Sequence, residues 1–432
     1  MPPGVLRLRK VIGATCALAV ASLGFVSCGS SSKKTNLSGL PYRAFVTNPL
    51  YRGAPAVAII NAQNDTLDGE AISLQGTITQ PSQMLLSPSR QYSLIYSPAA
   101  NNFAYVNNTT EAVATGSGSI TLPGFTESFV IASDNSTGYT AVPSATVIGT
   151  QIPGAVIVMN LLQGSILATL PVPSAHYVFI TPDGSEVLTF SDNTNTITLI
   201  SPVLVGSNSD PRTFVNTPGF DHPVFALFSS DSSTAYVLNC GPECGGTSAS
   251  IAVFDLTTLT VTATIPLPAA TTALISGTTM YVAGSAPGTP CGSGTAATAC
   301  GTLSVVNLTS LTANTPLQIT NGFHNHMELT ADGQLFIGAK TCSDVNIAGG
   351  EVRGCLSIFD TTNSTTIIPP ETGDVTGIAP IPGRQAVYVV QGAIIYIYDT
   401  QTDQLEVQTE PTPLVVTGQP YDVKYVDTGI PQ

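Results

Sequence analysis

The chain has 432 residues, of which 9% are charged and 43% are hydrophobic, and its formal net charge is −14. This hydrophobic content argues against a disordered protein, because enough apolar surface exists to offset the entropy lost on folding. The acidic balance argues against a nucleic-acid partner, because binding to phosphates needs clustered lysine and arginine. Beyond the N-terminus, no stretch is apolar over the roughly 20 residues that a spanning helix requires.

Residues 1–27 have the features of an export signal. Three basic residues precede an apolar stretch over residues 11–23, and small residues then lead to Cys28. The segment 25–29 resembles a bacterial lipobox, which implies that Cys28 is diacylated and becomes the new N-terminus. The alternative is ordinary signal cleavage nearby, with an incidental cysteine.

Residues 28–39 are expected to form a flexible tether, because serine, lysine and glycine dominate the first half of this segment. Gly29 follows the cysteine, and in lipoproteins of double-membraned bacteria this resemblance implies sorting to the outer membrane. We therefore expect an exported protein that its lipid holds at the membrane, facing the periplasm or the cell surface. Residues 40–432 are expected to form a single domain.

An internal repeat organises residues 40–432. Each unit opens with an apolar strand and a turn, as in residues 177–184, where Pro, Asp and Gly at the turn favour a tight reversal. A later strand ends in an aromatic residue followed by Asp, as in residues 253–255 and 358–360. Four short antiparallel strands that recur about every 48 residues are typical of propeller blades. The opening strands are expected near residues 83, 128, 176, 223, 272, 325, 375 and 421.

The two ends of the chain contain incomplete units. Residues 421–426 have no further strands after them, and residues 42–74 contain three strands without an obvious opening one. If the C-terminal strand completes the N-terminal blade, the ring closes and no strand edge stays unpaired. The sequence therefore predicts an all-β propeller of eight four-stranded blades. Seven blades are the alternative, because residues 97–100 also resemble the turn after an opening strand.

Several strands contain variants of a Tyr-Val-Thr-Asn sequence, at residues 45–48, 105–108, 236–239 and 281–284. With these segments, the turns and the aromatic-Asp steps, most of residues 40–427 resembles the YVTN family of β-propeller repeats. The resemblance implies a propeller fold. The family includes surface proteins, and it is similar in fold to lactonases and to propeller subunits of quinone-dependent dehydrogenases. Similarity of fold does not transfer their chemistry.

Six cysteines remain besides Cys16 and Cys28, and they fall in three consecutive units between the second and third strands. An exported compartment permits oxidation, and the spacings do not match zinc-binding patterns. We therefore predict the disulfides Cys240–Cys244, Cys291–Cys300 and Cys342–Cys355, with metal ligation by thiolates as the alternative. The closed loops lie on the face where propellers usually bind, although they could also serve only to resist proteolysis.

All four histidines, His176, His222, His324 and His326, are expected at the start of innermost strands, near the mouth of the central channel. His324 and His326 should share one face of a strand, because side chains alternate with period two. Carboxylates hold similar places, at Glu127, Asp221, Asp374 and Asp422. This pattern suggests a site for zinc, copper or iron, or for an anion. The alternative is that polar residues simply line a wet channel entrance. No other cofactor is expected.

The sequence favours a monomeric binding or scaffolding module that presents its looped face to a protein or glycan partner. One rival is a lactonase-like enzyme, against which the scarcity of lysine and arginine weighs, since the whole chain has 13 of them. A second rival is a metal-dependent redox protein that uses the histidines. No residue is assigned a catalytic role.

Overall fold

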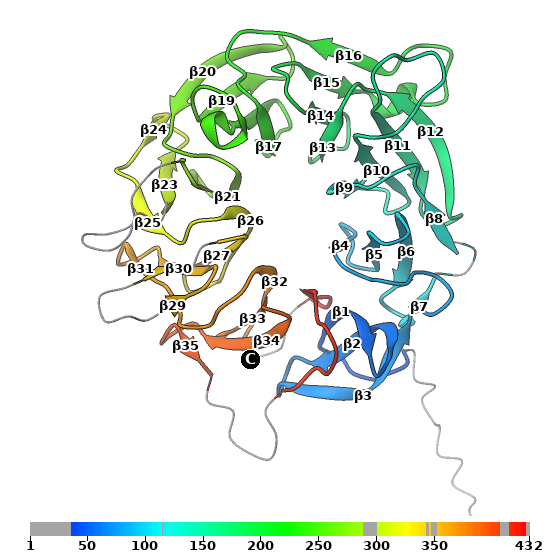
Figure 1. The fold of residues 1–432 in the computed structure, drawn as a ribbon, viewed down its shortest axis with the longest axis vertical. Coiled ribbons are helices and arrows are strands. Elements are labelled where there is room, and N and C mark those ends of the chain that lie inside the picture. Colours follow the sequence, from blue (N-terminus) through cyan, green and yellow to red (C-terminus); the bar gives the residue numbers. More distant parts are fainter. Residues whose placement is uncertain are drawn as a thin grey trace, which may run out of the picture. The chain divides into compact units, whose positions relative to one another are not determined.

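The computed structural model describes residues 36–114, 116, 118–287, 300–342, 345–346, 352–406 and 414–428. The expected signal peptide, the first part of the tether with Cys28, and Cys291 lie outside these residues. The described residues form a β-propeller of eight blades in a ring (Figure 1). None of the described helices is long and apolar enough to cross a membrane.

We number the blades 1 to 8 in chain order and give their strands from the channel outward. Blade 1 contains β36 (Asp422–Tyr425), β1 (Arg43–Tyr51), β2 (Ala54–Asn61) and β3 (Thr66–Ser73). Blade 2 contains β4 (Met84–Leu86), β5 (Tyr92–Ser97) and β6 (Asn102–Asn107), with β7 (Ala112–Val113) and β8 (Ser119–Thr121) both paired to β6. Blade 3 contains β9 (Ser128–Ile131), β10 (Thr137–Val142), β11 (Ala155–Asn160) and β12 (Ser165–Pro171). Blade 4 contains β13 (Ala175–Ile180), β14 (Val187–Ser191), β15 (Ile197–Ile200) and β16 (Arg212–Val215).

The second half of the chain follows the same plan. Blade 5 contains β17 (Pro223–Phe228), β18 (Thr234–Asn239), β19 (Ser250–Asp255) and β20 (Thr260–Pro266). Blade 6 contains β21 (Thr272–Ser276), β22 (Thr279–Gly284) and β23 (Gly301–Asn307), with β24 (Thr312–Ala313) and β25 (Leu317–Ile319) both paired to β23. Blade 7 contains β26 (Phe323–Leu329), β27 (Gln334–Lys340), β30 (Leu356–Asp360) and β31 (Thr365–Ile367). Blade 8 contains β32 (Val375–Pro380), β33 (Ala386–Gln391), β34 (Ile394–Asp399) and β35 (Gln404–Leu405).

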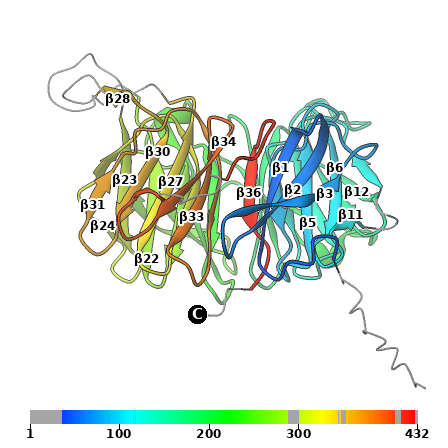
Figure 2. The ribbon, with the colours of Figure 1, turned by 90° about the horizontal axis from the view of Figure 1, so that it is seen from below.

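Three short elements lie in the connections between strands. Two are 3-10 turns, η1 (Pro202–Leu204) and η2 (Gly241–Cys244). The third is a hairpin of β28 (Val345–Asn346) and β29 (Val352–Arg353), inserted between β27 and β30. Figure 2 shows this hairpin rising from one face of the ring.

The ring closes as the sequence predicted. Strand β36 pairs antiparallel with β1, with Ala44 opposite Tyr425 and Thr47 opposite Asp422. The blade count is eight and not seven, because residues 98–101 form the turn between β5 and β6 and do not follow an opening strand. Closure leaves the innermost edge of blade 1 paired, so that β1 presents no free edge to another chain.

The hydrophobic core is divided into eight clusters, one between each pair of neighbouring blades. Each sheet therefore buries both of its faces, which explains the continuous apolar runs of the middle strands, such as Ala54–Asn61. The outermost strands alternate instead: in β20, every second residue is exposed over most of its length. The closing segment contributes to two clusters: Val423 and Tyr425 of β36 pack toward blade 8, and Val426, which directly follows the strand, packs toward blade 2.

A buried ionic network fastens the closing strand. The guanidinium of Arg43 donates from Nη1 to Glu111 Oε1 at 2.8 Å and from Nη2 to Asp427 Oδ1 at 2.6 Å. The Glu111 side chain is fully buried, and Ser38 Oγ also donates to it at 2.6 Å. Residues 36–39, which the sequence assigned to the end of a flexible tether, therefore include a serine that is fixed to the ring.

Candidate functional site

The connections that enter the innermost strands and those between second and third strands emerge on the same face of the ring, which we call the loop face. Several hydrogen bonds join these two sets of connections, and two of them show the pattern. Thr247 N, between β18 and β19, donates to Asp221 before β17 at 2.8 Å, and Thr341 N, after β27, donates to Asp374 before β32 at 2.8 Å. For the enlarged loops of blades 5 and 7, the sequence-based placement beside the strand starts is therefore correct.

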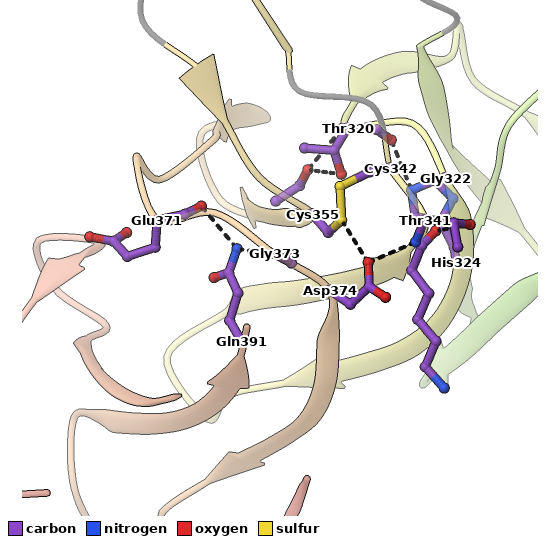
Figure 3. The surroundings of a disulfide bond; sticks show 12 residues. Thr320, Gly322, His324, Thr341, Cys342, Cys355, Glu371, Gly373, Asp374 and Gln391 are labelled. Carbon is purple, nitrogen blue, oxygen red and sulfur yellow. Dashed lines mark hydrogen bonds between the residues drawn. A yellow bond between two sulfur atoms is a disulfide. The ribbon is translucent and has the colours of Figure 1, made fainter. Parts of the chain in front are cut away.

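Two of the predicted disulfides are present on the loop face. The Cα atoms are 5.6 Å apart in both Cys240–Cys244 and Cys342–Cys355, which is the usual distance for a bridge. Cys355 Sγ lies 3.7 Å from Asp374 Oδ1, so that the second bridge rests against the connection into β32 (Figure 3). The two disulfides indicate an oxidising compartment such as that of exported proteins.

Loss of the disulfide that closes the longer loop should lower the free energy of unfolding more. The double change Cys342→Ser/Cys355→Ser opens a loop of 13 residues and should lower the free energy of unfolding by about 3 kcal/mol. The change Cys240→Ser/Cys244→Ser opens a loop of 4 and should cost about 2 kcal/mol. Urea denaturation of both variants measures this difference, and a larger loss for the shorter loop would contradict the entropic account.

A polar pocket of about 440 Å³, which we call the rim pocket, lies on the loop face of blades 4 and 5. Its hydrogen-bonding side chains are those of Asn195, Asp221, His222, Asn239, Thr247, Ser248, Ser250 and Thr264. Thr247 and Ser248 lie in the connection between β18 and β19. This connection begins with the turn η2, which the Cys240–Cys244 disulfide closes. The disulfide thus holds one wall of the pocket.

Asp221 organises the rim pocket. Burial alone would raise the pKa of Asp221, but hydrogen bonds from Thr247, Ser248 and His222 outweigh it and lower the pKa to about 2. A Cβ on Gly246 would lie 2.3 Å from Asp221 Oδ1, so only glycine permits this approach. The carboxylate is therefore ionised at neutral pH and fixed in place.

His222 adopts a strained backbone beside this carboxylate. Its φ is 55°, in the left-handed region that costs a residue with a side chain roughly 1–3 kcal/mol. Its N–H donates to Asn195 Oδ1 at 3.1 Å, and its Nδ1 lies 3.1 Å from Asp221 Oδ1. Strain of this kind persists where surrounding contacts impose it, and it is frequent at binding sites.

The innermost strands enclose a second cavity, of about 340 Å³, which we call the channel cavity. Its residues belong mainly to the first halves of these strands, so it lies in the half of the channel next to the loop face. One part of the wall is apolar and mostly aromatic, formed by Phe129, Tyr177, Phe179, Val224 and Phe225 of blades 3 to 5. The other part is polar and includes Gln83, Glu127, Asn325, His326, Asp422 and Lys424.

Bulges lie near the start of four innermost strands. The pairing shifts by one residue in β13, β17, β26 and β32, where the extra residues are His176, Val224, Asn325 and Thr376. A bulge inserts one residue, breaks the alternation of side chains and re-aims them. The expectation that His324 and His326 share one face by period two is wrong, because Asn325 is inserted between them.

His324 and His326 consequently have different surroundings. His324 is fully buried, and its Nε2 donates to Thr320 O at 2.9 Å. Burial lowers the pKa of His324 to about 4, so the ring is neutral and structural. Burial, with nearby Lys424 and Lys340, also lowers the pKa of His326 well below its ordinary value. His326 Nε2 is buried at the channel cavity without a hydrogen-bond partner among the described residues.

His176 lies on the rim between two carboxylates. Its Nδ1 is 2.6 Å from Asp192 Oδ1 and its Nε2 is 2.9 Å from Glu127 Oε2, while its ring stacks on Tyr177. Burial alone would lower the pKa of His176, but the two carboxylates outweigh it and raise the pKa. Both ring nitrogens are therefore engaged, and the imidazolium joins the connections of blades 3 and 4.

The pH dependence of stability should reveal this ion pair. A raised histidine pKa contributes stability that is complete below the unfolded value of about 6.5 and is lost as the pH rises through the folded value. The change His176→Gln should therefore cost up to about 1 kcal/mol at pH 6, because the carboxylates are partly exposed. The cost should shrink at pH 9. Thermal denaturation at both pH values tests this, and a cost that grows with pH would contradict it.

The structure does not bring the four histidines together. His176 and His222 lie on the rim, while His324, which is buried, and His326 both border the channel cavity. Within the part of the chain that the structure describes, no group of three or more His, Cys, Asp or Glu residues is arranged to hold a metal ion. The convergence expected from their places in the repeat is not seen, and within β26 the inserted Asn325 separates His324 from His326.

A charged triad that the sequence reasoning missed lies beside the channel cavity. Lys424 Nζ is 3.5 Å from Asp422 Oδ1, and the oxygens of Asp422 accept Met84 N and Val423 N at 2.8 Å each. Burial alone would lower the pKa of Lys424, but Asp422 and Glu328 outweigh it and raise the pKa. The alternation of β36 could have placed Asp422 and Lys424 on one face, but nothing in the sequence placed Glu328 of β26 beside them.

Comparisons with known proteins support the fold but do not identify a family or a function. No family model matches the chain, and no curated protein matches it significantly. Dihydro-heme d1 dehydrogenase NirN, solved in complex with DHE, is similar in structure with a TM-score of 0.62 and 12% identity, over 90% of this chain and 75% of that one. The β-propeller domain of Cps50 (Swd1) from Myceliophteria thermophila gives a TM-score of 0.51 and 9% identity, over 72% of this chain and 93% of that one. The class that fold and comparisons define is the eight-bladed β-propeller.

Proposed function

We propose that this propeller is a binding module that presents its loop face to a partner, and that the partner is a glycan. The observation that carries the proposal is the rim pocket beside the Cys240–Cys244 bridge. Its walls are rich in hydroxyl, amide and carboxylate groups, which match the hydroxyl groups of a sugar. The aromatic and arginine residues that dominate protein–protein contacts contribute only Phe220 to it.

The rim pocket is held in one shape before any ligand arrives. Asp221 is fixed by three donors, Gly246 allows the close approach and the disulfide closes the turn. A preformed site loses less entropy on binding, which favours affinity for a flexible polar ligand. A protein partner, the other class that the sequence suggested, would instead require a larger and more apolar contact.

Binding of purified bacterial surface polysaccharides to an immobilised array tests the proposal. The oxidised mature chain should retain at least one polysaccharide, and His222→Asn should weaken retention at least tenfold. Asparagine tolerates the left-handed backbone at this position, so the variant should fold normally. His176→Gln, outside the rim pocket, is the matched control and should bind as the wild type does. Retention of no polysaccharide, or equal retention by His222→Asn, would overturn the proposal.

We also propose that the module is exported and anchored through a lipid on Cys28. The export-type N-terminus and the two disulfides support this placement. In cells, Cys28→Ser should move the protein from the membrane fraction to the soluble exported fraction. A variant that stays with the membrane after a carbonate wash would rule out the anchor.

Membership of the YVTN repeat family is likewise a proposal. Three of the four segments that carry the resemblance, residues 45–48, 236–239 and 281–284, lie in the second strands β1, β18 and β22 of their blades. A recurring sequence at one topological position is what a repeat family requires.

A further inference from the structure

We propose that the channel cavity binds a small uncharged molecule that has a planar apolar body and a hydroxyl or carbonyl group at one end. This site is separate from the rim pocket and does not depend on glycan binding there. The cavity volume of about 340 Å³ is at the lower end of the range for small-molecule sites, which fits a ligand of one or two rings.

The apolar wall suits a planar body. Phe179 and Phe225 pack edge to face with ring centroids 5.0 Å apart, and Phe129 and Tyr177 also line the cavity. Aromatic rings in contact with a planar ligand gain from offset stacking or edge contacts in addition to area burial. Because these residues belong to three neighbouring blades, the wall is curved around one side of the channel.

The polar wall offers hydrogen-bonding atoms that the protein leaves unused. Asn325 Oδ1 and His326 Nε2 are buried, border the channel cavity and have no partner among the described residues. A buried polar atom without a partner costs about 1–3 kcal/mol, and a ligand or ordered water that bonds to it recovers this cost. The bulge at Asn325 is what brings these two consecutive residues to the same wall.

Charge balance at the cavity favours an uncharged ligand. The ammonium of Lys424 is already matched by Asp422 at 3.5 Å and by Glu328 nearby, and both Asp422 oxygens accept backbone N–H groups. His326 is neutral at physiological pH, as its lowered pKa requires. A charged ligand would therefore lose its hydration without gaining an unpaired countercharge, at a high cost.

Fluorescence titration with 2-naphthol tests this inference, and 2-naphthoate is the matched charged probe. The protein contains no tryptophan, so naphthyl emission can be followed without overlap from indole. We expect 2-naphthol to bind with a single site per chain, and 2-naphthoate to bind at least tenfold more weakly. Equal or tighter binding of 2-naphthoate would show a charged-ligand site and overturn the inference, as would an absence of 2-naphthol binding.

Two variants locate the site. His326→Phe keeps a ring but removes Nε2, and Asn325→Leu keeps the approximate volume but removes Oδ1; each should weaken 2-naphthol binding at least fivefold. Neither should lower the melting temperature, because Asn325 Oδ1 and His326 Nε2 have no hydrogen-bond partner among the described residues. His222→Asn, in the rim pocket, should leave 2-naphthol binding unchanged, so that the two sites are distinguished. Unchanged affinity in both channel variants would overturn the placement.

Discussion

Removal of residues 421–432 is expected to abolish cooperative folding of the ring. The deletion takes away β36, and with it the buried side chains of Val423, Tyr425 and Val426, which pack into the clusters on both sides of blade 1. Each buried apolar side chain of this size contributes about 2 kcal/mol, so the loss is comparable with the whole stability of a typical domain. The deletion also exposes the edge of β1 and removes Asp427, one of the two carboxylates that Arg43 binds. Circular dichroism during urea denaturation measures the effect.

A shorter truncation provides the control. Deletion of residues 429–432 leaves β36 and Asp427 in place, and it should leave the unfolding transition unchanged. A synthetic peptide of residues 414–428, added to the long truncation, should restore a cooperative transition. Strand β36 pairs with β1 through backbone hydrogen bonds, so it does not need to be covalently joined to the rest of the chain. If the long truncation unfolds as cooperatively and at the same denaturant concentration as the full chain, closure by β36 does not stabilise the ring.

The second large effect is expected from Lys424→Met. The change leaves the buried carboxylate of Asp422 without the ammonium 3.5 Å away, and it removes the positive charge that also acts on Glu328. Breaking a buried ion pair by removing one partner typically costs about 3–5 kcal/mol. We expect a loss in this range at pH 7.5, measured by urea denaturation of the variant and the wild type.

The way the stability loss of Lys424→Met changes with pH distinguishes the loss of the ion pair from a loss of side-chain packing. Burial raises the pKa of Glu328 above its ordinary value of about 4.5. A carboxyl group with a raised folded pKa stabilises the fold as the pH falls through that value, since the folded state then binds the proton more tightly. The deficit of Lys424→Met should therefore shrink between pH 7.5 and pH 5, and the added change Glu328→Gln should recover part of it at pH 7.5. A deficit that is independent of pH would indicate lost packing of the lysine side chain.

The architecture could be predicted from the sequence because each blade is a local unit. The turns and apolar runs fix the strands within a blade, and the expected opening positions 83, 128 and 272 fall within one residue of β4, β9 and β21. Closure followed from two incomplete units at the ends, because only their combination leaves no open edge. The prediction that residues 28–39 are flexible is wrong at Ser38, because Ser38 donates to Glu111, which lies in blade 2 and is distant in the sequence.

The sites were harder to predict because they depend on contacts between blades. The repeat correctly placed Asp221 and the Cys240–Cys244 bridge on one face, but it could not show that Gly246 allows the close approach that forms the rim pocket. The prediction from period-two alternation is wrong at Asn325, because the bulge depends on the pairing with β27 and cannot be recognised in the sequence of β26 alone. The partners of Lys424 come from strands nearly 100 residues apart in the sequence, so their meeting follows only from ring closure.

A crystal structure of the oxidised chain grown with 2-naphthol tests the central claim most directly, namely that closed blades create a ligand site in the channel. We predict eight blades, β36 paired with β1, and naphthol density between Phe179 and His326, with the hydroxyl group toward Asn325 and His326. An open arrangement of the blades, or naphthol bound only on the outer surface of a closed ring, would contradict the account.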